Sequence, residues 1–185
     1  RAPGELAWLA AHDDDSFARY EAVQQLMLDT LVARVSGKDS SPDAVIGAIA
    51  AMLARWSEDP AFVAEAAALP TESFIGDQML VVDPDAIHRA REALRRDIGR
   101  ELEGMWREAY DTTRANRFEY SPTAKGARRL KTVALGYINA SGAPDGASLA
   151  FAQFEDADNM TDRQGALTTL VGSPSDKRIA ALDIF

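Results

Sequence analysis

The sequence predicts an all-α protein, and three features of its 185 residues indicate this class. Apolar residues recur at steps of three and four, which places one apolar stripe on each helix. Alternating β patterns are absent, and Val81-Val82 is too short for a strand. Proline follows Ser or Asp at five places, a pairing typical of helix starts, because the first side chain accepts a bond from a free N–H and proline has none to lose. The five pairs are Ser41-Pro42, Asp59-Pro60, Asp83-Pro84, Ser121-Pro122 and Ser173-Pro174.

The first half of the chain predicts three helices in order. The acidic run at residues 13–15 precedes an apolar stripe at 17–35. Negative charge is favourable there because it complements the positive end of the helix dipole. A second helix covers residues 42–56, and a third begins at Pro60.

The second half predicts longer helices. The stripe after Asp83 continues to about Tyr110, and the stripe after Ser121 ends near Ile138. Residues 161–164 (TDRQ) fit a capping box, in which a Thr at the cap and a Gln three positions later satisfy free N–H groups. Together with the start at Ser173-Pro174, about nine or ten helices are expected.

Two architectures fit these helices, a compact bundle and a solenoid of stacked helix pairs. The proline-marked starts are unevenly spaced, so a solenoid would be irregular. The turn-rich segment 140–146 is too short for an interdomain linker, and residues 1–185 are expected to form a single helical domain.

Composition excludes several classes of function. There are 20 Lys and Arg against 29 Asp and Glu, and a net charge of -9 argues against a nucleic-acid partner. The chain has no Cys, which excludes disulfides, thiolate metal sites and a Cys nucleophile, and which suits the cytoplasm. No apolar run is long enough to span a membrane, and no signal peptide is evident.

Three motifs partly resemble known catalytic or metal-binding motifs, but none of them predicts a site. A zinc hydrolase needs two His one helical turn apart, whereas His12 and His88 are distant in sequence. Residues 146–150 (GASLA) mimic a nucleophile elbow but lack the strand that this elbow requires. Residues 156–162 (DADNMTD) begin like a calcium loop but continue without its Gly and Glu. No catalytic, cofactor-binding or metal-binding residue is therefore predicted.

Two basic segments differ in their balance of charge. Residues 85–117 hold eight Arg against seven acids, which favours a self-paired, solvated face over an anion-binding face. The expected i,i+4 pairs are Asp85–Arg89, Glu92–Arg96 and Glu103–Arg107. A second cluster is less balanced and is the better candidate for contacting an acidic surface. It consists of Lys125, Arg128, Arg129 and Lys131.

Five segments carry a further signal. They are 15–22 (DSFARYEA), 68–72 (ALPTE), 82–94 (VDPDAIHRAREAL), 120–131 (YSPTAKGARRLK) and 157–163 (ADNMTDR). In this order they resemble the C-terminal domain of bacterial aminopeptidase N, the alanyl aminopeptidases of the gluzincin class. The family usually has Trp where Tyr20 stands, and the last segment is the most specific.

The resemblance implies a zinc enzyme that removes N-terminal residues from peptides. Its zinc and catalytic residues would lie in a preceding thermolysin-like domain, so this chain carries no zinc itself. The chain would be an irregular α-solenoid of antiparallel helix pairs, a HEAT/armadillo-like superhelix, that covers the active site and limits peptide access. Its partners would be the catalytic and β-sandwich domains of its own parent chain and the parent's peptide substrates.

The ends of the sequence suggest a piece of a longer protein. The chain starts with Arg1 instead of Met and stops at Ile184-Phe185 in mid-pattern. The resemblance implies that it is the first half to two-thirds of the C-terminal domain. Truncation would leave an apolar face near residues 170–185 exposed. The alternative is a free-standing helical interaction module with a concave face. The role of Asn159 is also open between lining an internal cavity and capping the next helix.

Overall fold

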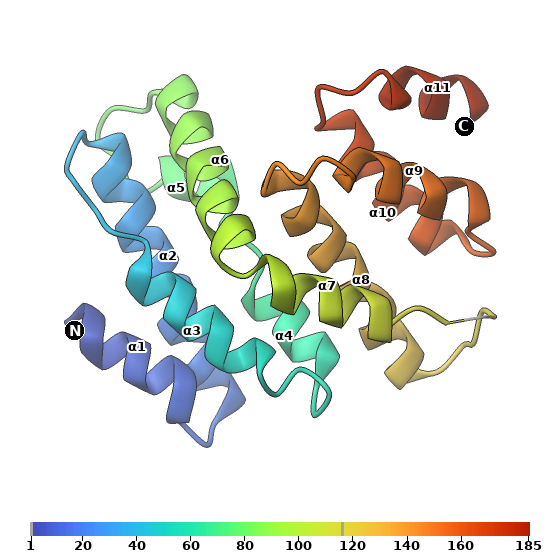
Figure 1. The fold of residues 1–185 in the computed structure, drawn as a ribbon. Helices are drawn as coiled ribbons and strands as arrows, with labels where there is room; N and C mark the ends of the chain where they lie inside the picture. Colours follow the sequence, from blue (N-terminus) through green and yellow to red (C-terminus); the bar gives the residue numbers. More distant parts are fainter. Residues whose placement is uncertain (1, 116) are drawn as a thin grey trace.

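The computed structural model describes residues 2–115 and 117–185. Within these ranges the chain forms helices and turns and no strand, which confirms the all-α prediction (Figure 1). The helices are α1 (Pro3–His12), α2 (Ser16–Val35), α3 (Asp43–Leu53), α4 (Pro60–Ala66), α5 (Glu72–Gly76), α6 (Pro84–Glu101), α7 (Glu103–Thr112), α8 (Pro122–Ala140), α9 (Gly146–Asp156), α10 (Met160–Val171) and α11 (Lys177–Ile184). None of the described helices is both long and apolar enough to cross a bilayer.

Most of the predicted helix starts are confirmed by their caps. Asp59, Asp83 and Ser121 each accept a bond from the backbone N–H three residues later, at 2.9, 3.0 and 3.1 Å. The following proline is the first residue of the helix in all three cases. Ser41 accepts from the N–H of Asp43 at 3.2 Å, and α3 begins at Asp43. Local sequence therefore sets the starts of α4, α6 and α8, whereas α3 begins one residue later than predicted, with Pro42 at a cap position that has no side-chain bond.

Two predicted starts are wrong. Ser173-Pro174 does not open a helix, because the Ser173 N–H bonds to the Leu170 carbonyl at 2.9 Å and closes the end of α10; α11 begins at Lys177. Thr161 is not the cap of α10. Asn159 has the extended backbone that a cap requires (φ -146, ψ 153), and its side chain accepts from the Asp162 N–H at 3.0 Å.

The long helix predicted after Asp83 is two helices. Leu102 separates α6 from α7 and leaves helical geometry (φ -110, ψ 18). Ile98 and Trp106 on either side of the break are both fully buried, and both α6 and α7 contact α8. The break lets one continuous apolar pattern follow the surface of a third helix.

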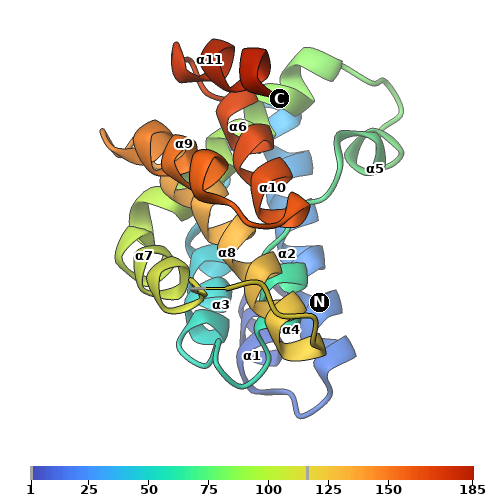
Figure 2. The same ribbon diagram turned by 90° about the vertical axis from the view of Figure 1, so that its right-hand side faces the viewer.

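Helices stack mainly on their neighbours in sequence. The contacts join α1 to α2 and α3, then α7 to α8, α9 to α10, and α11 to α9 and α10. The central helix, α8, contacts α4, α6, α7, α9 and α10 (Figures 1 and 2). This sequential stacking is the arrangement of a solenoid. Its irregularity agrees with the uneven spacing of the proline-marked starts.

Candidate functional site: a basic cleft beside a buried ion pair

A cleft of about 690 Å³ is lined by α6, α8, α10 and the connection from α4 to α5. Five of its lining residues carry positive charge, and no Asp or Glu lines it. The charged residues are Arg91 and Arg95 on α6, and Lys125, Arg128 and Arg129 on α8. The cleft is therefore a local region of positive charge on an acidic protein.

Helical periodicity places these cations together. Arg91 and Arg95 are one turn apart on α6, and Lys125, Arg128 and Arg129 follow one another at helical spacing on α8. A glycine also contributes, because a Cβ at Gly136 on α8 would lie only 2.9 Å from an Arg95 guanidinium nitrogen. Because residue 136 has no side chain, the Arg95 guanidinium group can lie close to α8.

The cations of the cleft are held mostly by backbone oxygens and by carboxylates outside the lining. Arg91 donates to the Pro70 carbonyl at 2.9 Å, and Arg128 donates to the Glu119 carbonyl at 2.8 Å. Arg129 pairs with Glu65 at the surface. Carbonyl bonds orient a guanidinium without neutralising it, so the side chains are positioned while net charge remains.

The charges of two further cations, Arg95 and Lys125, are only weakly compensated by nearby carboxylates. Glu92 lies 3.7 Å from a guanidinium nitrogen of Arg91 and at the same distance from one of Arg95. Lys125 is exposed and has no ion pair in the described ranges. An incoming anion would therefore find charge that the protein has not already neutralised.

The self-paired face predicted for residues 85–117 is only partly present. Glu103 and Arg107 pair at 2.9 Å as expected. Glu92, however, contacts Arg91 and Arg95 in place of Arg96. Arg107 also binds Asp145 across to the start of α9, at 2.7 Å, and hydrogen bonds with Asp145 and then Glu103 raise its pKa. Arg107 thus links α7 to the start of α9, which its spacing within one helix could not reveal.

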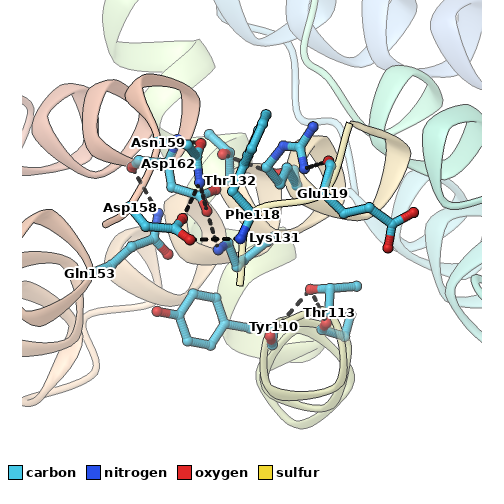
Figure 3. A network of polar contacts seen from close by, with 12 residues as sticks. Tyr110, Thr113, Phe118, Glu119, Lys131, Thr132, Gln153, Asp158, Asn159 and Asp162 are labelled. Carbon is cyan, nitrogen blue, oxygen red and sulfur yellow. Dashed lines mark hydrogen bonds and ion pairs between the residues drawn. The ribbon is translucent and has the colours of Figure 1, made fainter. Parts of the chain in front are cut away.

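Lys131 departs from the basic cluster predicted on α8. Its Nζ lies 2.7 Å from Oδ2 of Asp162 on α10, and both side chains are 9% exposed (Figure 3). Asn159 donates to the same Asp162 oxygen at 2.9 Å, and Gln153 on α9 donates to the Asp162 carbonyl at 3.0 Å. This ion-pair node, defined as Lys131, Gln153, Asn159 and Asp162, joins α8, α9 and α10.

A second contact extends the node to the loop before α8. Asp158 accepts from the Phe118 N–H at 2.6 Å (Figure 3). Arg128 of the cleft lies 4.7 Å from the centre of the Phe118 ring. Hydrogen bonds from the Asn159 side chain and then the Phe118 N–H lower the pKa of Asp158. Asn159 thus caps α10 and orients its neighbour, one of the two roles open from sequence. The node thus joins α8 to α10, two of the helices that line the cleft.

The two histidines and the segments 146–150 and 156–162 have other partners in the structure. His12 contacts the Trp8 carbonyl at 3.0 Å, and His88 pairs with Glu72 at 2.8 Å on an exposed surface. The segment 146–150 opens α9 after a turn, and in the segment 156–162 the side chain of Asp162 pairs with Lys131. Over residues 2–115 and 117–185, no three His, Cys, Asp or Glu side chains gather as a metal site would require.

The stacked helix pairs and the cleft between them define a helical-repeat protein. Residues 3–185 match the family described as "Domain of unknown function (DUF3458_C) ARM repeats", and the chain belongs to this family. The match confirms the armadillo-like solenoid and the resemblance to the C-terminal helical domain of bacterial aminopeptidase N.

Curated relatives agree with this assignment. The chain is 30% identical over 189 residues to aminopeptidase N of Caulobacter vibrioides, an alignment that covers 99% of this chain and 22% of that protein. It is 30% identical over 176 residues to aminopeptidase N of Escherichia coli K12, covering 91% and 20%. The chain thus spans about a fifth of the length of the relatives it matches.

One solved structure shows the same fold. The crystal structure of Legionella pneumophila aminopeptidase A in complex with aspartic acid superposes with a TM-score of 0.85 and 22% identity. The superposition covers 100% of this chain and 23% of that one. The helical arrangement therefore recurs as one part of a longer protein.

Proposed function

We propose that this chain is the non-catalytic helical domain of a zinc aminopeptidase that removes N-terminal residues from peptides. The observation that carries the proposal is the extent of the matches. Nearly all of the chain aligns with aminopeptidase N, yet it accounts for only about a fifth of each relative. The catalytic and β-sandwich domains of the same parent protein would be its partners.

Zinc does not fit the residues of this chain. His12 and His88 lie on different helices with their own partners, and no cluster of metal-ligating side chains occurs among the described residues. Any zinc of the parent would be held by residues outside these 185. We therefore assign no chemical step to this chain.

What the chain supplies is a wall of fixed shape. Contacts that link α1 through to α11 support the prediction of a single helical domain. The ion-pair node holds α8, α9 and α10 in register behind the cleft. A wall of this kind would limit access because parting its helices would expose buried apolar side chains such as Leu130 and Phe154 to water. Location in the cytoplasm stays a prediction.

Sequencing the complete open reading frame that encodes this chain tests the assignment to a zinc aminopeptidase. This frame should encode a His-Glu-x-x-His motif before Arg1, and the isolated 185-residue chain should hydrolyse no alanyl amide with or without added zinc. Turnover by the isolated chain would overturn the proposal. So would an initiator Met just before Arg1, which would favour a free-standing helical interaction module.

The access role needs its own measurement in the longer protein. Thr161 on α10 lines the cleft, and Thr161→Trp would narrow it. Hydrolysis of a long peptide should fall while hydrolysis of a single alanyl amide is unchanged. Ala152→Trp, at an exposed position of α9 outside the lining, is the matched control. Equal rates for all three proteins on both substrates would contradict the access role.

A further inference from the structure

We propose that the basic cleft binds the carboxylate groups of a peptide. The choice of a peptide as the ligand rests on the proposed function, whereas the preference for carboxylates rests on the cleft alone. The chain has a net charge of -9, yet five of its 20 Lys and Arg line this one hollow and no acid does. A cleft lined by one sign of charge focuses the field and concentrates ions of the opposite sign.

The positions of the cations indicate a ligand with more than one carboxylate. Arg91 and Arg95 belong to α6, while Lys125, Arg128 and Arg129 belong to α8. Guanidinium groups bind carboxylates through paired, charge-assisted hydrogen bonds, and Lys supplies a more flexible point charge. A ligand that carries two carboxylates can engage cations of both helices at once.

The rest of the lining fits peptide better than a bare anion. Leu69, Val133 and Met160 offer apolar surface, and Thr161 and Gln164 offer neutral hydrogen-bonding groups. The volume of about 690 Å³ lies within the range of small-ligand sites, roughly 300–1,000 Å³. A hollow of this size suits a few residues of extended peptide. Nucleic acid is disfavoured because the molecule as a whole is strongly acidic.

Calorimetric titration of the 185-residue chain with acetylated tetrapeptides tests the inference. The reference peptide carries two Glu and a free C-terminal carboxylate. One matched peptide has Gln for both Glu, and another has an amidated C-terminus. We expect the reference peptide to bind and its affinity to fall as salt is raised. Loss of binding with Gln would assign the side-chain carboxylates, and loss with the amide would assign the terminus; both results support the proposal.

Variants connect binding to the cleft. Arg95→Gln combined with Lys125→Gln should weaken the reference peptide at least tenfold. Arg178→Gln, exposed on α11 and outside the lining, should leave affinity unchanged. Unchanged helical circular dichroism in each variant would show that the fold is intact.

Several outcomes would overturn the proposal. They are absence of binding at millimolar peptide, equal affinity in the double variant and wild type, and equal or tighter binding of inorganic phosphate or a single-stranded oligonucleotide. None of these measurements involves catalysis or zinc. A failure here therefore leaves the aminopeptidase assignment standing, and a reading frame without the zinc motif would leave the binding result valid.

Discussion

The buried pair between Lys131 and Asp162 allows a quantitative test of what holds the C-terminal helices on α8. Asp162→Asn removes the negative charge but preserves the size of the side chain. The Lys131 ammonium would then remain 9% exposed without its paired carboxylate. Removal of one partner of a buried pair costs about 3–5 kcal/mol, since the remaining charge is desolvated and unpaired.

That magnitude is large for a domain whose total stability is about 5–15 kcal/mol. With a urea m-value of about 3 kcal/mol/M, the unfolding midpoint should fall by about 1–1.7 M. Lys131→Met should destabilise similarly, because it leaves the Asp162 carboxylate uncompensated. The double variant should lose less than the sum of the two, since it buries no unpaired charge. Hydrogen exchange should show α10 losing protection while α1 to α3 keep theirs.

An exposed ion pair provides the control. Arg55 and Glu58 pair at 2.8 Å, but their side chains are 58% and 60% exposed. Glu58→Gln should leave the urea midpoint unchanged within error, because water already solvates both groups. If Asp162→Asn moves the midpoint no further than Glu58→Gln does, the inner pair is effectively solvated and the reasoning is refuted.

Three other predictions follow from particular contacts. Gly99→Ala should lower the free energy of unfolding strongly, because the new Cβ would lie 2.5 Å from the Tyr137 carbonyl oxygen of α8. The control Gly47→Ala has open space inside α3 and should raise the free energy of unfolding in urea by about 0.5–1 kcal/mol. Equal effects of the two substitutions would contradict the close approach at Gly99. Burial raises the pKa of Tyr110 to about 12 and that of Tyr137 further, so their neutral forms stabilise the fold below pH ~10 and this contribution is lost as pH rises toward 12 and beyond. The rise in absorbance at 295 nm that reports ionisation of these two tyrosines should therefore coincide with the loss of helical circular dichroism. Ionisation of both near pH 10 in the intact fold would contradict the prediction. Exposed apolar side chains of α11 and the chain end should cause self-association that grows with concentration in light scattering, and a monomer at every concentration would count against it; they are Ile179, Leu182, Ile184 and Phe185.

The errors of sequence reasoning have a common cause. Thr161 and Asn159 are both good capping residues, and the choice between them depends on where the chain leaves α9. Ser173-Pro174 is a sequence signal for a helix start, but the Ser173 N–H bonds to the Leu170 carbonyl at the end of α10. The break at Leu102 likewise goes with packing, because α6 and α7 on either side of it both contact α8.

Of the candidate site, three cations on α8 were identified from sequence, and Lys131 was grouped with them wrongly. Neighbouring positions on a helix differ by about 100° in direction, so Arg129 can line the cleft while Lys131 turns inward to Asp162. The contribution of α6 was missed, because the acids near Arg91 and Arg95 suggested that these charges were already paired. Only the structure shows that the nearest carboxylate, Glu92, lies at 3.7 Å from both.

The sequence by itself determined the helical class, the starts of α2, α4, α6 and α8, and the lack of a zinc-binding pair of histidines. These features depend on neighbours within about four positions, since caps, apolar stripes and metal-binding pairs on a helix are local. The tertiary structure alone decided which charges are buried and which line the cleft. Residues from 67 to 169 meet there, and their encounter depends on helix packing and loop paths that no local pattern encodes.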